Sequence, residues 1–249
     1  KRCKILEENN EPSLRTTSKF ITETRELKVL QFKLSNKCQL ACAHCDPSLS
    51  STWANLLNVT PKVHHALELT DEFITELKEI VPTLDELKFT GGEPFLDDTH
   101  WQMLEYLTDV DTSNCKLSYI TNGLIDPKPH VWEGWKEIEI HVSVDGHKDT
   151  YEWFRRNAKW DLLVDKVDKL SKYGDIIIAY SMTPFTVDNL PEAKEFWQYP
   201  IHETPIVYPK YTSLTDFPDN KNLCITFAKE WDQRWNTVGW SQKLYNWVV

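Results

Sequence analysis

The sequence predicts an α/β fold in which parallel strands alternate with helices around a single core. Its 249 residues lie near the upper limit of what one hydrophobic core organises, so one domain with short appendages is expected. A content of 41% hydrophobic residues, 12% aromatic residues and only 7 glycines is typical of a globular chain. Strand-like and helix-like segments alternate along the chain, which indicates βα units and a parallel sheet.

Five segments have the apolar pattern of strands, and a sixth strand is expected further on. The five are residues 28–35, 84–90, 116–121, 137–143 and 176–181. The sixth is expected at 206–208 or 211–214. Apolar residues recur at helical spacing over 71–81, 98–110, 148–156, 160–172 and 191–199. Thr70 is expected to cap the first of these helices and Pro82 to end it.

Three parts of the chain follow from this pattern. Residues 1–25 form a charged N-terminal arm, which does not begin with Met and is expected to be processed, trimmed or incomplete. Residues 26–215 carry the alternating strands and helices, and 216–249 are expected to be a C-terminal helical extension. Leu223, Phe227, Trp231 and Trp235 recur every four residues in this extension, so its apolar stripe docks on the parent domain or, alternatively, covers the site or binds a partner.

The charge balance argues against nucleic-acid partners, and the hydropathy pattern argues against membrane partners. Lys and Arg number 28 against 38 Asp and Glu, which gives a net charge of −10 and argues against binding nucleic acid by broad phosphate neutralisation. No stretch approaches the roughly 18 consecutive apolar residues of a membrane span, and no apolar export signal follows the first residues. We therefore expect a soluble, cytoplasmic protein without nucleic-acid or membrane partners.

Polar and glycine-containing segments follow the predicted strands, each at the point where a strand ends. These segments are 38–45, 91–94, 121–122, 143–145 and 181–184. In a closed or partly closed α/β barrel, the carboxyl ends of the strands open on one face, where active sites are built. The five segments are therefore expected to meet at one site.

Three of the six cysteines are crowded into a C-x3-C-x2-C arrangement made by Cys38, Cys42 and Cys45. Six randomly placed cysteines would produce this spacing with a probability of about 0.3%. Ionising three neighbouring thiols at neutral pH costs roughly 6 kcal/mol before their mutual repulsion, so a metal is implied. Structural zinc prefers four ligands and no fourth is obvious, whereas a 4Fe-4S cluster held by three cysteines leaves one iron open for a non-protein ligand. Zinc remains the alternative.

The chain resembles the radical S-adenosylmethionine (SAM) enzymes over residues 28–215. The resemblance rests on the three cysteines after the first strand, together with Gly91-Gly92-Glu93-Pro94, Thr121-Asn122-Gly123 and Ser143-Val144-Asp145-Gly146. Residues 34–38, 151–155, 188–191 and 208–211 resemble the twitch/SPASM branch of this superfamily. Position 44 is commonly aromatic in these enzymes, so His44 is a mild departure that keeps a flat ring.

The resemblance implies a partial (β/α)6 TIM-like barrel and a chemistry. It implies that SAM binds the open iron of one 4Fe-4S cluster and is split by one electron. The 5′-deoxyadenosyl radical then removes hydrogen from a substrate. The branch favours a peptide or protein side chain; a small molecule such as a nucleoside, sugar or cofactor precursor is the alternative, as is a non-enzymatic zinc or Fe-S scaffold. An electron donor such as flavodoxin or ferredoxin is implied.

The resemblance also assigns cofactor-binding residues. Gly91 and Gly92 allow close approach of the backbone, and with Glu93 they are expected to receive the ammonium group of SAM. The guanidinium of Arg155 is expected to pair with its carboxylate, although the neighbouring Arg156 is an alternative and either could be a solvated charge. Thr121, Asn122 and Ser143 are suited to the ribose hydroxyls, and Ser143 is alternatively a turn residue.

The remaining cysteines set the expected number of clusters. Cys115 precedes an apolar strand and Cys224 lies in an apolar helical run, so both are expected to be buried small hydrophobic residues. With these two excluded, too few cysteines follow Cys45 to build a second four-thiolate site. One cluster is predicted, with Cys3 as the reservation, since residues preceding it could supply partners.

Overall fold

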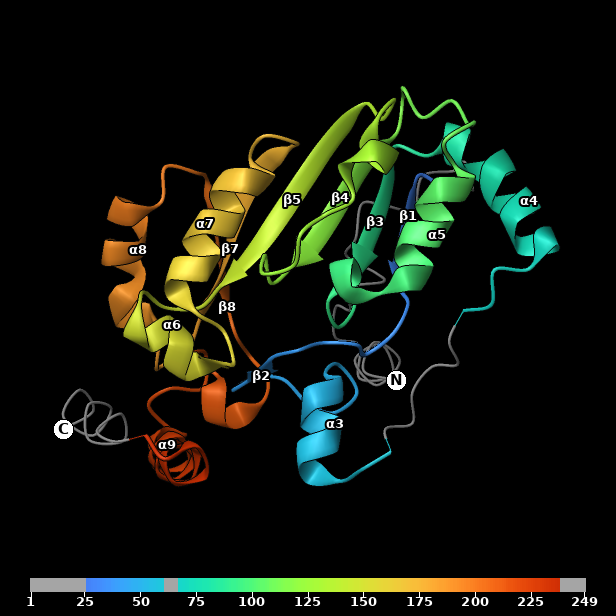
Figure 1. Cartoon of the computed structure of the whole chain (residues 1–249). Helices are drawn as coiled ribbons and strands as arrows, with labels where there is room; N and C mark the ends of the chain where they lie inside the picture. Colours follow the sequence, from blue (N-terminus) through green and yellow to red (C-terminus); the bar gives the residue numbers. More distant parts are fainter. Residues whose placement is uncertain (1–25, 61–66, 238–249) are drawn as a thin grey trace, which may run out of the picture.

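A computed structural model describes residues 26–60 and 67–237 (Figure 1). The strands are β1 (Val29–Lys33), β2 (Ala41–Cys42), β3 (Glu86–Thr90), β4 (Lys116–Thr121), β5 (Glu137–Val144), β6 (Arg155–Arg156), β7 (Asp175–Met182) and β8 (Ile201–Pro205). The α-helices are α3 (Ser51–Leu57), α4 (Asp71–Ile80), α5 (Asp98–Tyr106), α6 (Asp149–Phe154), α7 (Trp160–Leu170), α8 (Leu190–Phe196) and α9 (Lys221–Trp235). Short 3-10 helices are η1 (Val81–Thr83), η2 (Pro94–Leu96), η3 (Pro129–Trp132), η4 (Val187–Asn189) and η5 (Lys210–Thr212).

The main sheet has six strands in the order β1-β3-β4-β5-β7-β8. Each of its neighbouring pairs is parallel, so every strand presents its carboxyl end at the same edge. Figure 1 shows the arrowheads of these strands pointing toward β2, α3 and α9. The prediction of an α/β fold with a parallel sheet is confirmed, as are the five strands expected from apolar pattern, each within a few residues of its predicted bounds.

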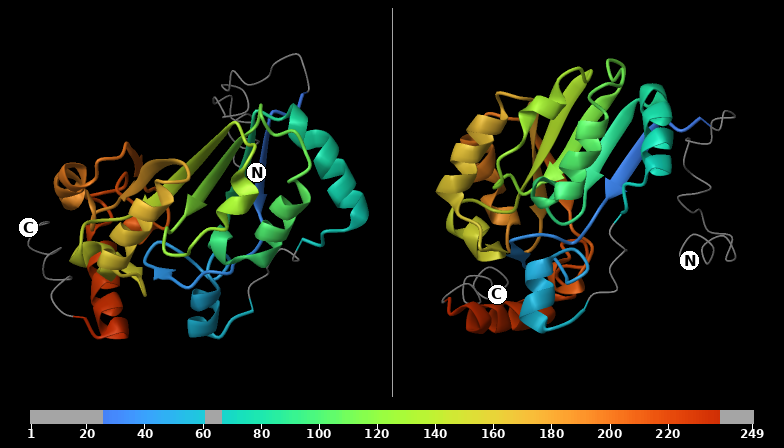
Figure 2. Two further views of the ribbon diagram at one scale, coloured as in Figure 1. Left: turned by 45° about the horizontal axis from the view of Figure 1, so that its top comes forward. Right: turned by 45° about the vertical axis from the view of Figure 1, so that its right-hand side comes forward.

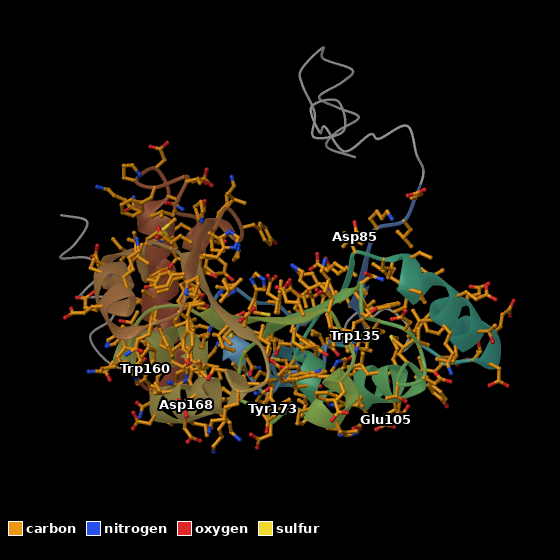
Figure 3. The ribbon with its side chains drawn as sticks, turned by 90° about the horizontal axis from the view of Figure 1, so that it is seen from above. Asp85, Glu105, Trp135, Trp160, Asp168 and Tyr173 are labelled. Atoms are coloured by element: carbon orange, nitrogen blue, oxygen red, sulfur yellow. The ribbon has the colours of Figure 1, made fainter. Side chains whose placement is uncertain are left out.

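The two faces of the sheet differ in chemistry because successive side chains in a strand point to opposite sides. Leu87, Leu117, Ile140 and Ile178 are fully buried on one face and belong to a core that also contains helical residues such as Leu163. Helices α4, α5, α7 and α8 lie along this face (Figure 2). Seen from above, Glu105 of α5 lies along the same side as Trp160 and Asp168 of α7 and Tyr173 just after it (Figure 3). The opposite face carries polar residues, of which Lys88, Glu139 and His141 are half-buried.

Helix α4 shows how the sequence sets a boundary. The Thr70 hydroxyl accepts a hydrogen bond from the Phe73 N–H at 3.2 Å, and Asp71 lies in the first turn, where the helix dipole favours an acidic residue. The α-helix ends at Ile80 and η1 continues across Pro82. Both the predicted cap and the predicted end are confirmed.

The predicted position of the sixth strand is wrong. This strand is β8, which pairs in parallel with β7 through Ile201 and the four residues after it. Residues 206–208 follow it as irregular chain, and 210–212 form η5. The strand was missed because only its first residue is a β-branched aliphatic.

The predicted helix over 148–156 is also too long. α6 ends at Phe154, and Arg155 and Arg156 form β6, which pairs antiparallel with β2. The predicted helix over 98–110 likewise ends at Tyr106. Nothing in the periodicity of the sequence marks β6, because its partner strand is more than a hundred residues earlier.

Helix α9 docks on the end of the molecule where the cysteines lie. Trp231 is buried and its ring centroid lies 5.7 Å from that of Trp53 in α3 and 6.2 Å from that of Trp153 in α6. Ala41 and Ala43 of the cysteine segment belong to the same apolar cluster. Phe227, Trp231 and Trp235 of the expected stripe therefore pack here, whereas Leu223 is 44% exposed and the neighbouring Cys224 is buried instead. The arm over 1–25 and the residues after 237 lie outside the described residues. None of the described helices is both long and apolar enough to cross a membrane.

Candidate active site

The segment with the three cysteines is held by the first turn of α3. The hydroxyl of Ser51 donates to the carbonyl of Cys38 and accepts from its N–H, both at 3.1 Å. Ser50 caps α3, and its hydroxyl donates to the Leu40 carbonyl at 2.6 Å. The indole N–H of Trp53 donates to the Cys42 carbonyl at 3.0 Å. The backbone of the cysteine segment is therefore fixed by α3.

The predicted site residues converge on one cavity at the carboxyl edge of the sheet. The cavity has a volume of about 170 Å³. It is lined by Cys38, Leu40, Cys42, His44, Cys45, Leu49, Gly91, Gly92, Ile120, Thr121, Asn122, Ser143 and Arg155. The lining includes all three predicted cluster ligands and every predicted cofactor-binding residue except Glu93. Four of the five predicted strand-end segments thus meet at this cavity, whereas residues 181–184 of the fifth do not line it.

The glycine turn packs against the start of the cysteine segment. Gly91 has φ +131°, a conformation that favours glycine. A Cβ on Gly92 would lie 2.3 Å from the Lys37 carbonyl oxygen, so no side chain fits there. The N–H of Gly92 donates to the Ser35 carbonyl at 3.1 Å. These glycines therefore allow close approach of two protein segments, in addition to the approach to a ligand that the sequence indicates.

Glu93 is fully buried and braces the ends of β3 and β4. Its carboxylate accepts hydrogen bonds from the Thr121 hydroxyl and the Asn122 N–H, both at 2.6 Å, and from the Phe95 N–H at 3.1 Å. Burial raises the pKa of Glu93 to about 7, although the three donors oppose this shift. The structure thus places Glu93 beside the cavity lining, in contact with Thr121 and Asn122 rather than in the wall itself.

Gln39 is a site residue that sequence reasoning missed. Its side-chain amide exchanges hydrogen bonds of 3.2 Å with that of Asn122, which joins the cysteine segment to the end of β4. The amide nitrogen of Asn122 also lies 4.0 Å from the Cys38 sulfur. A Gln between cysteines carries no distinctive signal in one sequence, so only the fold reveals this contact.

Arg155 and Asp145 form a buried ion pair behind Cys42. The Arg155 Nε lies 2.7 Å from the Asp145 Oδ2, and both side chains are more than nine-tenths buried. One Arg155 Nη lies 3.9 Å from the Cys42 sulfur. Burial lowers the pKa of Arg155, but the charges of Asp145 and Cys42 outweigh this and hold it above its ordinary value. Arg155 is therefore a permanent cation at the cavity wall.

His44 occupies the space between this ion pair and α6. Its ring stacks on Phe154 with centroids 5.2 Å apart, and its Nδ1 lies 3.7 Å from the Asp145 Oδ2. Burial lowers the pKa of His44, and Asp145 only partly offsets this. Sequence reasoning identified the flat ring at this position but missed its acidic neighbour, whose only signal was an Asp-Gly pair after a strand.

The three thiols have raised pKa values, chiefly because they are buried. The pKa of Cys45 rises to about 12, and that of Cys42 lies well above its ordinary value although Arg155 opposes the shift. Protein groups alone therefore keep these thiols neutral, and a bound cation would be needed to hold them as thiolates. Within the described residues, no three His, Cys, Asp or Glu side chains converge on one ion position. The three cysteines line one cavity.

The other described cysteines lie elsewhere. Cys115 and Cys224 are completely buried, as predicted, and neither lines the cavity. Burial raises the pKa of each to about 11. Their environment is that of small hydrophobic residues. Cys3 lies outside the described residues.

Known proteins share both sequence and fold with this chain. It is 24% identical over 231 residues to mycofactocin maturase MftC of Mycolicibacterium smegmatis, a match that covers 88% of this chain and 51% of MftC. It is 25% identical over 156 residues to GTP 3′,8-cyclase of Staphylococcus epidermidis, covering 60% of this chain and 44% of the cyclase. The chain spans about half the length of these curated relatives.

A solved structure has the same fold. The crystal structure of Streptococcus suis SuiB superposes with a TM-score of 0.53 at 13% sequence identity, over 85% of this chain and 48% of SuiB. The profile of the Radical SAM superfamily matches residues 32–196, more than half of the chain, and this range contains the whole cavity lining. The chain therefore belongs to the radical SAM superfamily, a family of enzymes that use SAM and a 4Fe-4S cluster.

Proposed function

We propose that this chain holds one 4Fe-4S cluster through Cys38, Cys42 and Cys45, and that it uses SAM to abstract hydrogen from a substrate. A cluster in this position supplies the single electron that splits SAM into methionine and a 5′-deoxyadenosyl radical. The observation that carries the proposal is that the cysteine segment and the ends of three strands share one cavity. The three-thiol donor set suits a cluster with one open iron.

The residues around the cavity would bind and orient SAM. The backbone at Gly91 and Gly92 lies in the cavity wall, where its polar groups suit recognition of the ammonium group. Ser143 presents a half-buried hydroxyl, and Asn122 an amide, that can hydrogen-bond to ribose. In this proposal Glu93 acts through Thr121 and Asn122, whose positions it fixes.

A polar row on the face of the sheet opposite α4, α5, α7 and α8 favours a polar substrate. Residues 139, 141 and 143 of β5 share one face of the strand because side chains alternate. Glu139 Oε1 lies 2.8 Å from the His141 Nε2 and 3.1 Å from the Lys116 Nζ on β4. This hydrogen-bonded row begins next to Ser143 in the cavity wall. It would offer both donors and acceptors to a substrate that extends from the cavity along the sheet.

A peptide or protein side chain is the proposed substrate. The twitch/SPASM resemblance of residues 34–38 and 151–155 supports this assignment. SuiB, which has the same fold, has been solved bound to its precursor peptide SuiA. A small molecule is the second candidate, since one relative is a GTP cyclase. We also propose an external one-electron donor such as flavodoxin or ferredoxin.

Anaerobic reconstitution of the chain with iron and sulfide tests the proposal. We expect a brown protein with one cluster that releases 5′-deoxyadenosine when dithionite and SAM are added. Cys42→Ala should abolish the cluster, whereas the matched control Cys115→Ala should keep it. A colourless protein that binds one zinc and leaves SAM intact would contradict the proposal. Equal loss of iron in the two variants would show that the ligand assignment is wrong.

A second experiment separates the two substrate classes. The reconstituted chain would be incubated with SAM and reductant, either with GTP or with peptides encoded next to its gene. The peptide proposal predicts faster 5′-deoxyadenosine release and a changed peptide mass only with the peptide. Stimulation by GTP with no change in any peptide would favour the small-molecule alternative.

A further inference from the structure

Four side chains with buried polar atoms gather behind Cys42, namely His44, Asp145, Tyr151 and Arg155. Arg155 Nε and Asp145 Oδ2 face each other as an ion pair at 2.7 Å, and the His44 Nδ1 lies 3.7 Å from the same Asp145 oxygen. Within the described residues, His44 Nδ1 and Tyr151 Oη have no hydrogen-bond partner. Buried polar atoms are nearly always hydrogen-bonded, so a concentration of buried charge and unpaired polar atoms in one place indicates a function.

The backbone fixes Arg155 directly opposite Cys42. The antiparallel pair of β2 and β6 places Cys42 across from Arg155 and Ala41 across from Arg156. The Ala43 N–H extends this pairing by donating to the Phe154 carbonyl at 2.8 Å. Arg155 then reaches the Cys42 sulfur with one Nη at 3.9 Å. The fold thus builds a dedicated strand pair that holds a cation against one cluster ligand.

Asp145 is equally fixed on the other side of the guanidinium. It follows β5 directly, is completely buried, and accepts a hydrogen bond through Oδ1 from the Ser181 N–H at 3.2 Å. The Arg155 Nε faces Asp145 and one of its Nη atoms faces Cys42. The guanidinium is therefore already engaged at two of its three nitrogens, before any contribution to binding the SAM carboxylate.

We propose that Arg155 is a positioning residue for Cys42 and that the Arg155–Asp145 pair sets the reduction potential of the cluster. The inference rests on the proposed function, because it needs a cluster on Cys42. The potential of an iron–sulfur cluster depends on nearby charge and on hydrogen bonds to its sulfurs. A buried positive charge at the sulfur stabilises the reduced, more negative state, and Asp145 opposes this effect.

The proposal predicts that neutralising Asp145 and neutralising Arg155 shift the reduction potential of the cluster in opposite directions. Asp145→Asn leaves Arg155 uncompensated, so the potential should become less negative. Arg155→Gln leaves the Asp145 charge alone next to Cys42, so the potential should become more negative. The double variant removes both charges and should lie between the two single variants. Arg156→Gln is the matched control, because that guanidinium stacks on Trp235 at 4.9 Å and the variant should leave the potential unchanged.

A redox titration followed by electron paramagnetic resonance of the reconstituted, SAM-free chain measures these potentials. SAM affinity is measured on the same variants by calorimetry. Opposite shifts of Asp145→Asn and Arg155→Gln support the inference. Unchanged potentials together with weaker SAM binding in the Arg155 variants would overturn it and assign Arg155 to the SAM carboxylate. Shifts in the same direction would also overturn it.

One further variant decides the question if a single charge removal prevents folding. Arg155→Lys keeps the charge but loses the fork that reaches both Asp145 and Cys42, so a more negative potential with retained SAM affinity is expected. An unchanged potential in Arg155→Lys together with reduced SAM affinity would overturn the inference. If the parent chain gives no cluster signal, the proposed function itself fails; if the parent has a cluster and no variant shifts its potential, only this inference fails.

Discussion

Two buried carboxylates at the same edge of the sheet are stabilised in different ways. Glu93 is 1% exposed and is held by three uncharged donors, the Thr121 hydroxyl and the N–H groups of Phe95 and Asn122. Asp145 is 0% exposed and faces the cationic Arg155 at 2.7 Å. Both carboxylates follow strands of the main sheet. Each contacts a residue that lines the cavity with the cysteines.

This difference in partners gives the two carboxylates different roles. Glu93 fixes the positions of its neighbours, whereas Asp145 belongs to a pair of charges. Uncharged donors leave Glu93 with a pKa raised by burial, so its field at the cavity is weak whenever it is protonated. The Asp145–Arg155 ion pair is more than nine-tenths buried, and its guanidinium lies 3.9 Å from the sulfur of Cys42. Burial of charge is costly, so a pair of this kind is evidence of function more than of stability.

Removal of Asp145 should have the largest effect on folding. Asp145→Ala leaves the Arg155 guanidinium buried without its counter-charge, and breaking such a pair costs about 3–5 kcal/mol. Anaerobic urea unfolding of the parent and the variant measures this loss. The double variant Asp145→Leu with Arg155→Met replaces the pair by apolar groups of similar size and should recover most of the stability. A loss below about 1 kcal/mol for the single variant would mean that the pair is solvated.

Removal of Glu93 should cost somewhat less, because it leaves uncharged groups unpaired. Glu93→Ala removes the acceptor of three buried donors and is expected to destabilise the fold by about 3 kcal/mol. Glu93→Gln keeps one oxygen acceptor and the side-chain shape, so about 1 kcal/mol is expected. Thermal unfolding monitored by circular dichroism distinguishes the two. Equal losses in both variants would show that the side-chain shape, and not the hydrogen bonds, stabilises this edge.

The pH dependence of stability should distinguish the two carboxylates further. The pKa of Glu93 rises from 4.5 to about 7 on burial, so between these values the folded state keeps a proton that the unfolded state has released. Stability contributed by this group is present below pH 4.5 and is lost as the pH rises toward 7, by up to about 3 kcal/mol. Urea unfolding at intervals across this window should show the decline in the parent. Glu93→Gln should remove it, and an unchanged slope in that variant would place the titration elsewhere.

The sequence predicts those strands and helices whose pattern depends on residues adjacent in the chain. The strand over 116–121 matches its observed bounds, and the capped helix after Thr70 begins at its predicted residue, because apolar alternation and capping are properties of adjacent residues. The sixth strand was misplaced because its residues have little apolar alternation and its pairing with β7 is decided by the sheet. The two-residue β6 depends on a partner far away in the chain.

The same division applies to the site. The cysteines, Gly91, Gly92, Thr121, Asn122 and Ser143 could be predicted because each lies in a motif at a strand end. The partners of Arg155 could not, because the ion pair with Asp145 and the contact with Cys42 arise only when β6 pairs with β2. Gln39 was missed for the same reason. Motifs therefore indicate which side chains line the ligand site. The fold determines which other side chains hold those residues in place.

An exposed ion pair of the same length isolates the effect of burial. Lys78 on α4 lies 2.7 Å from Asp109, the distance that also separates Arg155 from Asp145. The side chain of Asp109 is 70% exposed, so water solvates both partners and competes with their attraction. Asp109→Asn should therefore leave the unfolding midpoint within the error of measurement, in the same urea titration in which Asp145→Ala loses several kcal/mol. A comparable loss in both variants would mean that distance governs these pairs, and the special status of the Asp145–Arg155 pair beside Cys42 would then have no energetic basis.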